Sequence, residues 1–394
     1  MSKNSPDQIR KEITERIATA IQSGTMPWRT PWRCHPNAGL PANFQSKRRY
    51  TGINTLILMG SALERDYHSR FWGSSSSVLS QIGAHVKKGE KATFVTFFKM
   101  LSKKNRDTGA VDKDRKGNDR MVPLLRVYPV FNIEQFQAPT VETLLDGRGT
   151  VSVVKALLGQ LDRKNRTNQT TLAELKTIAK KYASKESLSK AKTREALASL
   201  INEGIQEKLR KYRADVVVAD AQTDPDFESA ERLVTLSGAK IKHGGNRAFY
   251  RPSSDFIQLP LKDSFESAVD YYQTAFHELA HWTCPKNRVG RTQQFEDKES
   301  GYAFEELVAE MSSCFTLLES GVPLAENMME KSQQYIAAWL KKMKDDPKYI
   351  FAASTQASKI TDYLLTFIGK KNPSYNDDRA KLDRSVDNNE RSVA

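Results

Sequence analysis

The 394-residue chain has few cysteines and no long apolar run. Its three cysteines, Cys34, Cys284 and Cys314, lie far apart and form neither a disulfide framework nor a Cys-x-x-Cys metal pair. No stretch reaches the roughly 18 consecutive apolar residues of a membrane span, and the polar residues 1–22 contain no apolar signal-peptide core. We therefore expect a cytoplasmic protein in a reducing compartment, with no membrane partner.

Acidic residues are scarce in the first two thirds of the chain. Residues 1–138 carry 23 Lys/Arg against 11 Asp/Glu, residues 139–215 carry 16 against 9, and residues 216–394 carry 22 against 27. The net charges are therefore +12, +7 and −5, which together give the formal +14. This uneven distribution favours a polyanionic partner for the first part. A soluble basic surface without a partner is the alternative.

Hydrophobic periodicity and composition predict an α+β fold with two domains and a helical insert. Residues 1–138 are expected to form a small α+β domain in which helices precede two aromatic-rich strands, at 93–99 and 124–131. Residues 139–215 are a basic helical insert or linker. Residues 216–375 form a second, mainly helical domain with a small sheet, and residues 376–394 form a polar, disordered tail.

The insert contains the run TLAELKTIAKKYASKESLSKAKTREALASLI at 171–201. This run resembles the small helix–extended–helix modules of SAP-type and transcription-terminator N-terminal domains, which bind nucleic acid. A plain helical linker or hairpin is the alternative reading of the same residues.

A candidate metal site lies in the acidic third part of the chain, at His277-Glu278-Leu279-Ala280-His281. Histidines four residues apart lie on one face of a helix, where two imidazoles can bind one metal ion. Glu278, next to the first histidine, can act as the base for a metal-bound water. The expected cofactor is Zn²⁺ or another divalent metal such as Mn²⁺ or Co²⁺.

A hydrolytic zinc site needs a third protein ligand, and the run YAFEELVAE at 302–310 supplies it. We assign Glu306 as the third ligand. Glu310, one turn later, is expected to hydrogen-bond a ligand histidine from the second shell. Glu305 remains the rival ligand, because a sequence does not fix the phase of a helix to one residue. The hairpin near 249–259 is expected to supply an edge strand along which a substrate peptide could lie.

Aromatic and basic residues alternate in the first domain, as single-stranded DNA requires: cations bind its phosphates and flat rings stack on its unpaired bases. Phe94, Phe97, Tyr128 and Phe131 are alternatively core residues. The predicted DNA-binding residues are Trp28, Arg29, Trp32, Arg33, Arg48, Arg49, Tyr50, Trp72, Lys87, Lys88 and Lys91.

These motifs resemble a known family. The segments MPWRTPW, YTGINTLIL and FWGSSSSVLSQIGAHVKKGEKATFV resemble the N-terminal domain of the ArdC antirestriction family, and the segments GGNRAFYRPSSDFIQLP, YYQTAFHELAHWT and YAFEELVAEMSSCF resemble its C-terminal zincin domain. The resemblance implies sequence-independent binding of single-stranded DNA, a metallopeptidase-like domain, carriage on conjugative plasmids or phages, and protection of incoming DNA from restriction. It assigns His277, His281 and Glu306 as ligands and Glu278 as base. The long insert at 139–215 departs from the family pattern.

Several functions remain open on the sequence alone. The leading hypothesis is a single-stranded DNA-binding antirestriction protein, with a protein substrate or a host restriction factor as a further candidate partner. The rival is a DNA-activated zinc metalloprotease that cleaves DNA-bound proteins. A toxin aimed at a host protein and a purely structural use of the metal are two weaker alternatives.

Overall fold

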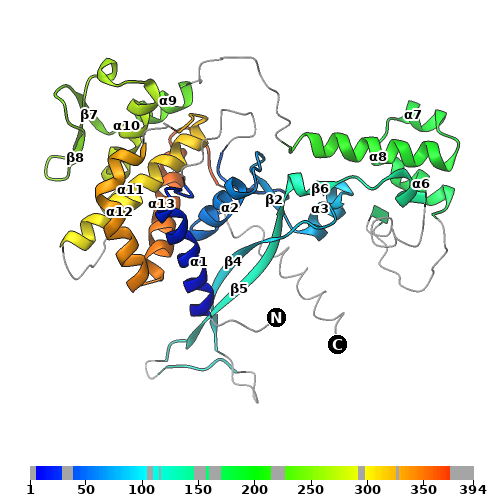
Figure 1. The fold of residues 1–394 in the computed structure, drawn as a ribbon, viewed down its shortest axis with the longest axis horizontal. Coiled ribbons are helices and arrows are strands. Elements are labelled where there is room, and N and C mark those ends of the chain that lie inside the picture. The colour runs from blue at the N-terminus through cyan, green and yellow to red at the C-terminus, as the bar shows by residue number, and fades with distance from the viewer. Residues whose placement is uncertain are drawn as a thin grey trace.

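The computed structural model describes residues 6–28, 39–103, 110–114, 117–145, 157–158, 170–213, 227–291, 298–324 and 328–372. They form an α+β structure with small sheets, which confirms the predicted fold class (Figure 1). None of the helices in these ranges is long and apolar enough to cross a membrane. The predicted tail, 376–394, lies outside the described residues.

The first part of the chain contains short strands and three helices. Its elements are α1 (Pro6–Gln22), β1 (Ala42–Asn43), α2 (Ile53–Glu64), β2 (Phe71–Gly73), α3 (Ser75–Ile82), β3 (His85–Val86), β4 (Thr93–Ser102), β5 (Met121–Asn132), η1 (Ile133–Gln135) and β6 (Phe136–Gln137). The two strands predicted at 93–99 and 124–131 are present and longer than expected, because they pair with each other along their whole length.

The central sheet has the strand order β1-β2-β5-β4, so β4 is an edge strand. Strands β4 and β5 form an antiparallel ribbon, with Thr93 opposite Val130 and Ser102 opposite Met121. Helix α2 covers one face of this ribbon through a small core, and the hydroxyls of Ser61 and Thr93 meet there at 2.7 Å. The core residues are Leu58, Ala62, Trp72, Val95 and Val130.

The middle segment contains α4 (Val141–Leu145), α6 (Leu172–Ala179), α7 (Lys185–Lys190) and α8 (Arg194–Arg210). Thr171 and Glu174 form a capping box that starts α6. Helix α7 occupies most of the stretch that the SAP-like resemblance implies to be extended.

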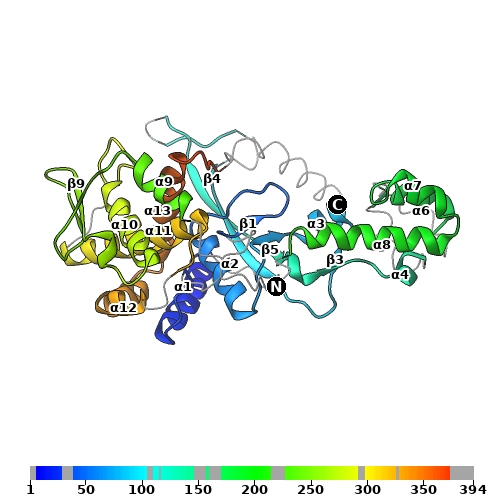
Figure 2. The ribbon, with the colours of Figure 1, turned by 90° about the horizontal axis from the view of Figure 1, so that it is seen from above.

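The middle segment is docked on the first part. Apolar side chains of α6 and α8 share a core with α3 and β6, in which Leu175 and Ile201 pack with Ile82 and Phe136. The Tyr182 hydroxyl donates to the Ile82 carbonyl at 2.9 Å. The segment therefore extends the first part instead of spacing it from the third, and α6–α8 lie at the opposite end of the molecule from α10–α13 in both views (Figures 1 and 2).

The third part is mainly helical, as expected. Its elements are α9 (Glu228–Leu236), β7 (Lys240–His243), β8 (Phe249–Arg251), β9 (Phe256–Leu259), η2 (Lys262–Ser264), α10 (Ala268–Trp282), α11 (Lys298–Ser320), α12 (Met328–Asp345) and α13 (Lys348–Thr366). The small sheet has the order β7-β9-β8, with β8 and β9 as the predicted antiparallel hairpin.

The first and third parts share one hydrophobic core. Ile17 and Ile21 of α1, Trp28 in the turn after it, and Leu56 of α2 belong to the same buried cluster as Phe304 and its neighbours on α11–α13. A buried ion-pair network crosses the same contact, because Glu319 of α11 pairs with Arg49 at 3.0 Å and with Arg70 at 2.7 Å. The predicted domain boundaries at 138/139 and 215/216 remain predictions. In packing, the first part shares one core with the middle segment and another with the third part.

Candidate metal centre

Helix α10 carries the His-Glu-Leu-Ala-His motif. The Ser267 side chain caps its first turn by accepting from the Asp270 backbone N–H at 3.2 Å. Phe276, Leu279 and Ala280 face the core. This phase turns His277 and His281 together toward a cavity on the other side of the helix.

The two histidines meet a carboxylate from α11. His277 Nε2 lies 3.1 Å from His281 Nε2, and the Glu306 carboxylate lies 3.5 Å from the first and 3.4 Å from the second. One ligand atom from each of the three residues falls within 4.8 Å of the other two. The structure therefore brings together the three residues assigned as ligands.

The carboxylate of Glu305, the rival ligand, contacts the other ring nitrogen of His281. Its Oε1 lies 3.1 Å from His281 Nδ1, and it also accepts from the Arg291 guanidinium and, at 3.2 Å, from the Cys284 thiol. A carboxylate on the ring nitrogen remote from a metal fixes the tautomer and the orientation of the imidazole. Glu305 thus contacts the His281 ring at Nδ1, the nitrogen that faces away from His277 and Glu306. Glu310 is buried on the same helix, and its second-shell role stays a prediction.

The electrostatics of this cluster favour a bound cation. Burial by itself lowers the pKa of His281, but the adjacent carboxylates of Glu305 and Glu306 outweigh it and raise that pKa to about 10. Burial would raise the pKa of Glu306, yet its hydrogen bonds to His277 and His281 hold it well below its usual range. A site that stabilises a proton so strongly through two carboxylates offers the same attraction to a metal ion.

Glu278 lies beside the histidines and is only 7% exposed. Burial raises the pKa of its carboxyl group, with the neighbouring histidines opposing the shift. A carboxylate with a raised pKa accepts and returns a proton near neutral pH more readily than an ordinary one.

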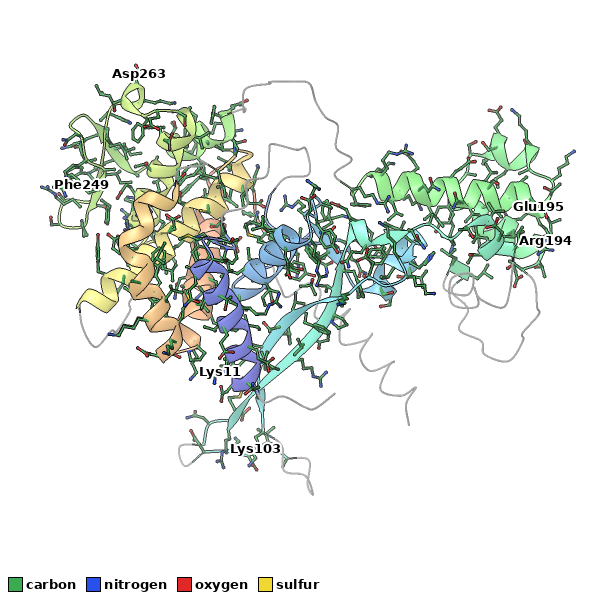
Figure 3. All side chains as sticks on the ribbon, in the orientation of Figure 1. Lys11, Lys103, Arg194, Glu195, Phe249 and Asp263 are labelled. Carbon is green, nitrogen blue, oxygen red and sulfur yellow. The ribbon has the colours of Figure 1, made fainter. Side chains whose placement is uncertain are left out.

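A cavity of about 600 Å³ opens onto these groups. Phe249 and Tyr250 of β8 form one wall, and Tyr302 of α11 lies on the lining one turn before Glu306. Because β8 is an edge strand of its sheet, the predicted hairpin does border the cleft, and Figure 3 labels Phe249 on it.

The donor set fits a divalent metal. Two imidazole nitrogens and one carboxylate oxygen, with an open cavity before them, are the protein ligands of a catalytic zincin site. The four-residue spacing of His277 and His281 predicted these two ligands from the sequence. Arg291 and Cys284, which hold Glu305, were not predicted, and neither residue stands in a pattern that would have indicated it.

Two of the predicted DNA-binding aromatic residues, Trp28 and Trp72, lie inside the protein. Trp28 is 0% exposed and Trp72 is 1% exposed, so both rings are core residues here and not surface platforms. The Arg49 side chain is buried in ion pairs with Glu319 and Asp362. Tyr50 is half-buried and packs against the core beneath the ribbon.

The remaining predicted cations are more accessible. Lys88 and Lys91 are exposed, whereas Arg48 and Lys87 are half-buried. Arg29, Trp32 and Arg33 lie outside the described residues. Two exposed rings, Phe94 and Phe98, were not predicted as DNA contacts, although the alternation in TFVTFFK places them on one face of a strand.

Two family models match the chain. The model described as the N-terminal domain of anti-restriction factor ArdC matches residues 7–131, and the model described as a zincin-like metallopeptidase matches residues 228–356.

Curated relatives align over most of the chain. Two Escherichia coli proteins named DNA primase TraC are 29% and 30% identical over 374 and 363 residues, which is 92% and 91% of this chain but 27% and 20% of theirs. The chain thus spans about a quarter of their length or less. The uncharacterised protein y4eC of Sinorhizobium fredii is 26% identical, with 91% of this chain and 92% of that protein covered.

Solved structures agree with these matches. Crystal structures of the antirestriction ArdC protein from plasmid R388, one metal-free and one Mn(II)-bound, are each 26% identical and align with TM-scores of 0.59 and 0.56. They cover 91% and 92% of this chain and 97% and 98% of the solved chains. The two family models match the two parts of the fold in chain order, and the solved structures align with both. The chain belongs to the ArdC antirestriction family, with an ArdC-type N-terminal domain followed by a zincin-like metallopeptidase domain.

Proposed function

We propose that this protein is a sequence-independent single-stranded DNA-binding antirestriction protein of a mobile element, and that its zincin-like domain holds a divalent metal, Zn²⁺ in the first instance. The observation that carries the proposal is the presence, in one chain, of a basic ArdC-type domain and the His277–His281–Glu306 cluster. The R388 relative with bound Mn(II) supports a divalent ion and leaves Mn²⁺ or Co²⁺ as alternatives to Zn²⁺.

The basic excess supports a nucleic-acid partner. Residues 1–138 have a net charge of +12, and the helices docked on them add a further +7 from 139–215. Phosphate contacts by such cations give binding that is indifferent to base sequence and that weakens as salt rises.

The metal-site residues have separable roles in this proposal. His277, His281 and Glu306 would hold the ion, which when bound supplies Lewis-acid polarisation of a carbonyl group. Glu305 orients the His281 ring through Nδ1. Glu278 would take a proton from an attacking water and return it to a leaving amine. The cavity bordered by β8 would position an extended peptide.

Binding of a labelled single-stranded oligonucleotide by the full chain tests the first half of the proposal. The full chain is required because residues of α1 and α2 share their core with the zincin-like helices. Affinity should fall as salt rises, and unlabelled duplex should compete less well than single strand. Absence of binding at low salt would contradict the proposal.

A DNA-activated zinc metalloprotease that cleaves DNA-bound proteins is the second candidate, and the buried Glu278 beside the histidines favours it. The discriminating variant is Glu278→Gln, which removes the base and keeps the side-chain volume. If protection of unmodified DNA in a restricting host needs proteolysis, this variant loses protection while it retains metal and DNA. If the metal is a structural brace, Glu278→Gln is silent and His277→Ala lowers stability.

A further inference from the structure

One face of the β4–β5 ribbon carries exposed apolar side chains. In the antiparallel register, even-numbered residues of β4 and odd-numbered residues of β5 share this face. Phe94 is 48% exposed and Phe98 is 51% exposed, and Met121 and Val127 on β5 are also exposed. We call these four residues the outer ribbon face. They make up half of the large exposed hydrophobic residues in the described part of the chain.

The opposite face of the ribbon is covered. Val95, Val130 and Tyr128 pack against α2 there, with Trp72 buried among them. The ribbon therefore already has a core, and the outer ribbon face is not needed to build it. Exposed phenylalanines on a ribbon that is already packed on its other side indicate a binding surface.

The segment of the chain that carries this face is strongly basic. Residues 87–126 contain twelve lysines and arginines against five aspartates and glutamates, a net charge of +7 that is half of the formal +14 of the chain. Lys91 before β4, Lys103 after it and Arg120 before β5 are exposed, and Lys103 lies toward the far end of the ribbon (Figure 3). The Arg10 guanidinium of α1 lies 5.6 Å from the centre of the Phe98 ring.

We propose that the outer ribbon face is the base-stacking platform for single-stranded DNA, with Phe94 and Phe98 as the stacking rings. This inference rests on the proposed function and locates its binding surface away from Trp28 and Trp72. The two rings stand four residues apart on one strand, about 13 Å. That distance is roughly four times the 3.4 Å nucleotide spacing along one strand of B-DNA, so a short run of nucleotides reaches both.

The same features disfavour a second copy of the chain as the occupant. Two ribbons face to face would bring together two segments of charge +7. Strand addition at the β4 edge is also blocked at its middle, because the Asn54 side chain accepts from the Thr96 N–H at 2.8 Å and donates to the Thr96 carbonyl at 2.7 Å.

The test uses the full chain and a labelled oligothymidylate at fixed salt. Stacking of one base contributes about 5- to 140-fold to affinity, so Phe94→Ala/Phe98→Ala should weaken binding by at least about 25-fold. The dependence of affinity on salt should not change, because the phosphate contacts remain. Phe94→Tyr/Phe98→Tyr should bind like the parent chain. An abasic oligonucleotide of equal length should bind the parent chain as weakly as oligothymidylate binds the alanine variant.

A matched control is Leu236→Ala/Leu261→Ala, which removes two comparably exposed side chains from the third part and should leave DNA binding unchanged. If the parent chain binds and the alanine variant binds equally well, the platform is wrong and the proposed function stands. If the tyrosine variant is as weak as the alanine variant, ring stacking is wrong. A change of oligomeric state in place of affinity would make the face a contact between copies. If the parent chain binds no oligonucleotide, both proposals fail.

Discussion

The buried ion-pair network around Glu319 joins α11 of the third part to the first part of the chain. Glu319 Oε1 accepts from Arg70 at 2.7 Å and from the Leu40 backbone N–H at 2.8 Å, and Oε2 accepts from Arg49 at 3.0 Å. The Glu319 side chain is 6% exposed and that of Arg49 is 8% exposed. Every one of these partners comes from a residue more than 240 positions earlier in the chain.

Glu319→Gln removes the charge and keeps the volume. An amide can accept at only one end, so its NH₂ would direct a donor toward a guanidinium or an N–H that also donates. Withdrawing one member of a buried ion pair costs about 3 to 5 kcal/mol, because the remaining charge stays desolvated. With a urea m-value of about 3 kcal/mol per M, the midpoint of unfolding should fall by about 1 to 1.7 M.

Asp362→Asn is the matched control. It removes the second carboxylate on Arg49, which accepts at 2.7 Å but is 37% exposed and can be replaced by water. Its cost should be about 1 kcal/mol or less. The double variant takes both carboxylates from Arg49, so its loss should exceed the sum of the two single losses.

The assay is urea unfolding of the full chain, followed by far-ultraviolet circular dichroism and by tryptophan fluorescence. Trp28 and Trp339 lie in the shared core, so their fluorescence reports on this contact. If Glu319→Gln costs no more than Asp362→Asn, the network is solvated in solution and the two parts are not joined through a dry interface.

Two further predictions concern the metal centre. Glu305→Gln should weaken binding of Zn²⁺ or Mn²⁺ by about 10- to 100-fold, because it replaces the carboxylate that contacts His281 Nδ1. Calorimetric titration measures the affinity, and an unchanged value would show that Glu305 does not support the metal ligands. In the metal-free protein the pKa of His281 is raised from 6.5 to about 10 by the adjacent carboxylates, so its contribution to stability is complete below pH 6.5 and is lost as pH rises toward 10. The urea midpoint with chelator present should therefore decline across this range more in the parent chain than in His281→Gln, and equal slopes would contradict the assignment.

The sequence by itself determined the local half of the metal site. His277 and His281 must share a helix face because the helical repeat is 3.6 residues. The two strands predicted at 93–99 and 124–131 follow from short-range rules as well, whereas their full lengths, 93–102 and 121–132, depend on their pairing. The uneven distribution of charge along the chain is also known without a structure, because it is obtained by counting charged residues.

Only the tertiary structure decided which side chains these elements present to one another. The choice between Glu305 and Glu306 depends on how α11 is rotated against α10, and that rotation is set by packing of Phe304 and Leu307 into the core. Trp28 and Arg49 looked like DNA contacts because a sequence does not show that a ring or a cation will be covered by a helix some 270 residues later. Phe94 looked equally like core, and it is exposed because α2 covers the other face of its strand. Burial is a property of contacts between distant segments, so the pattern within one segment cannot determine it.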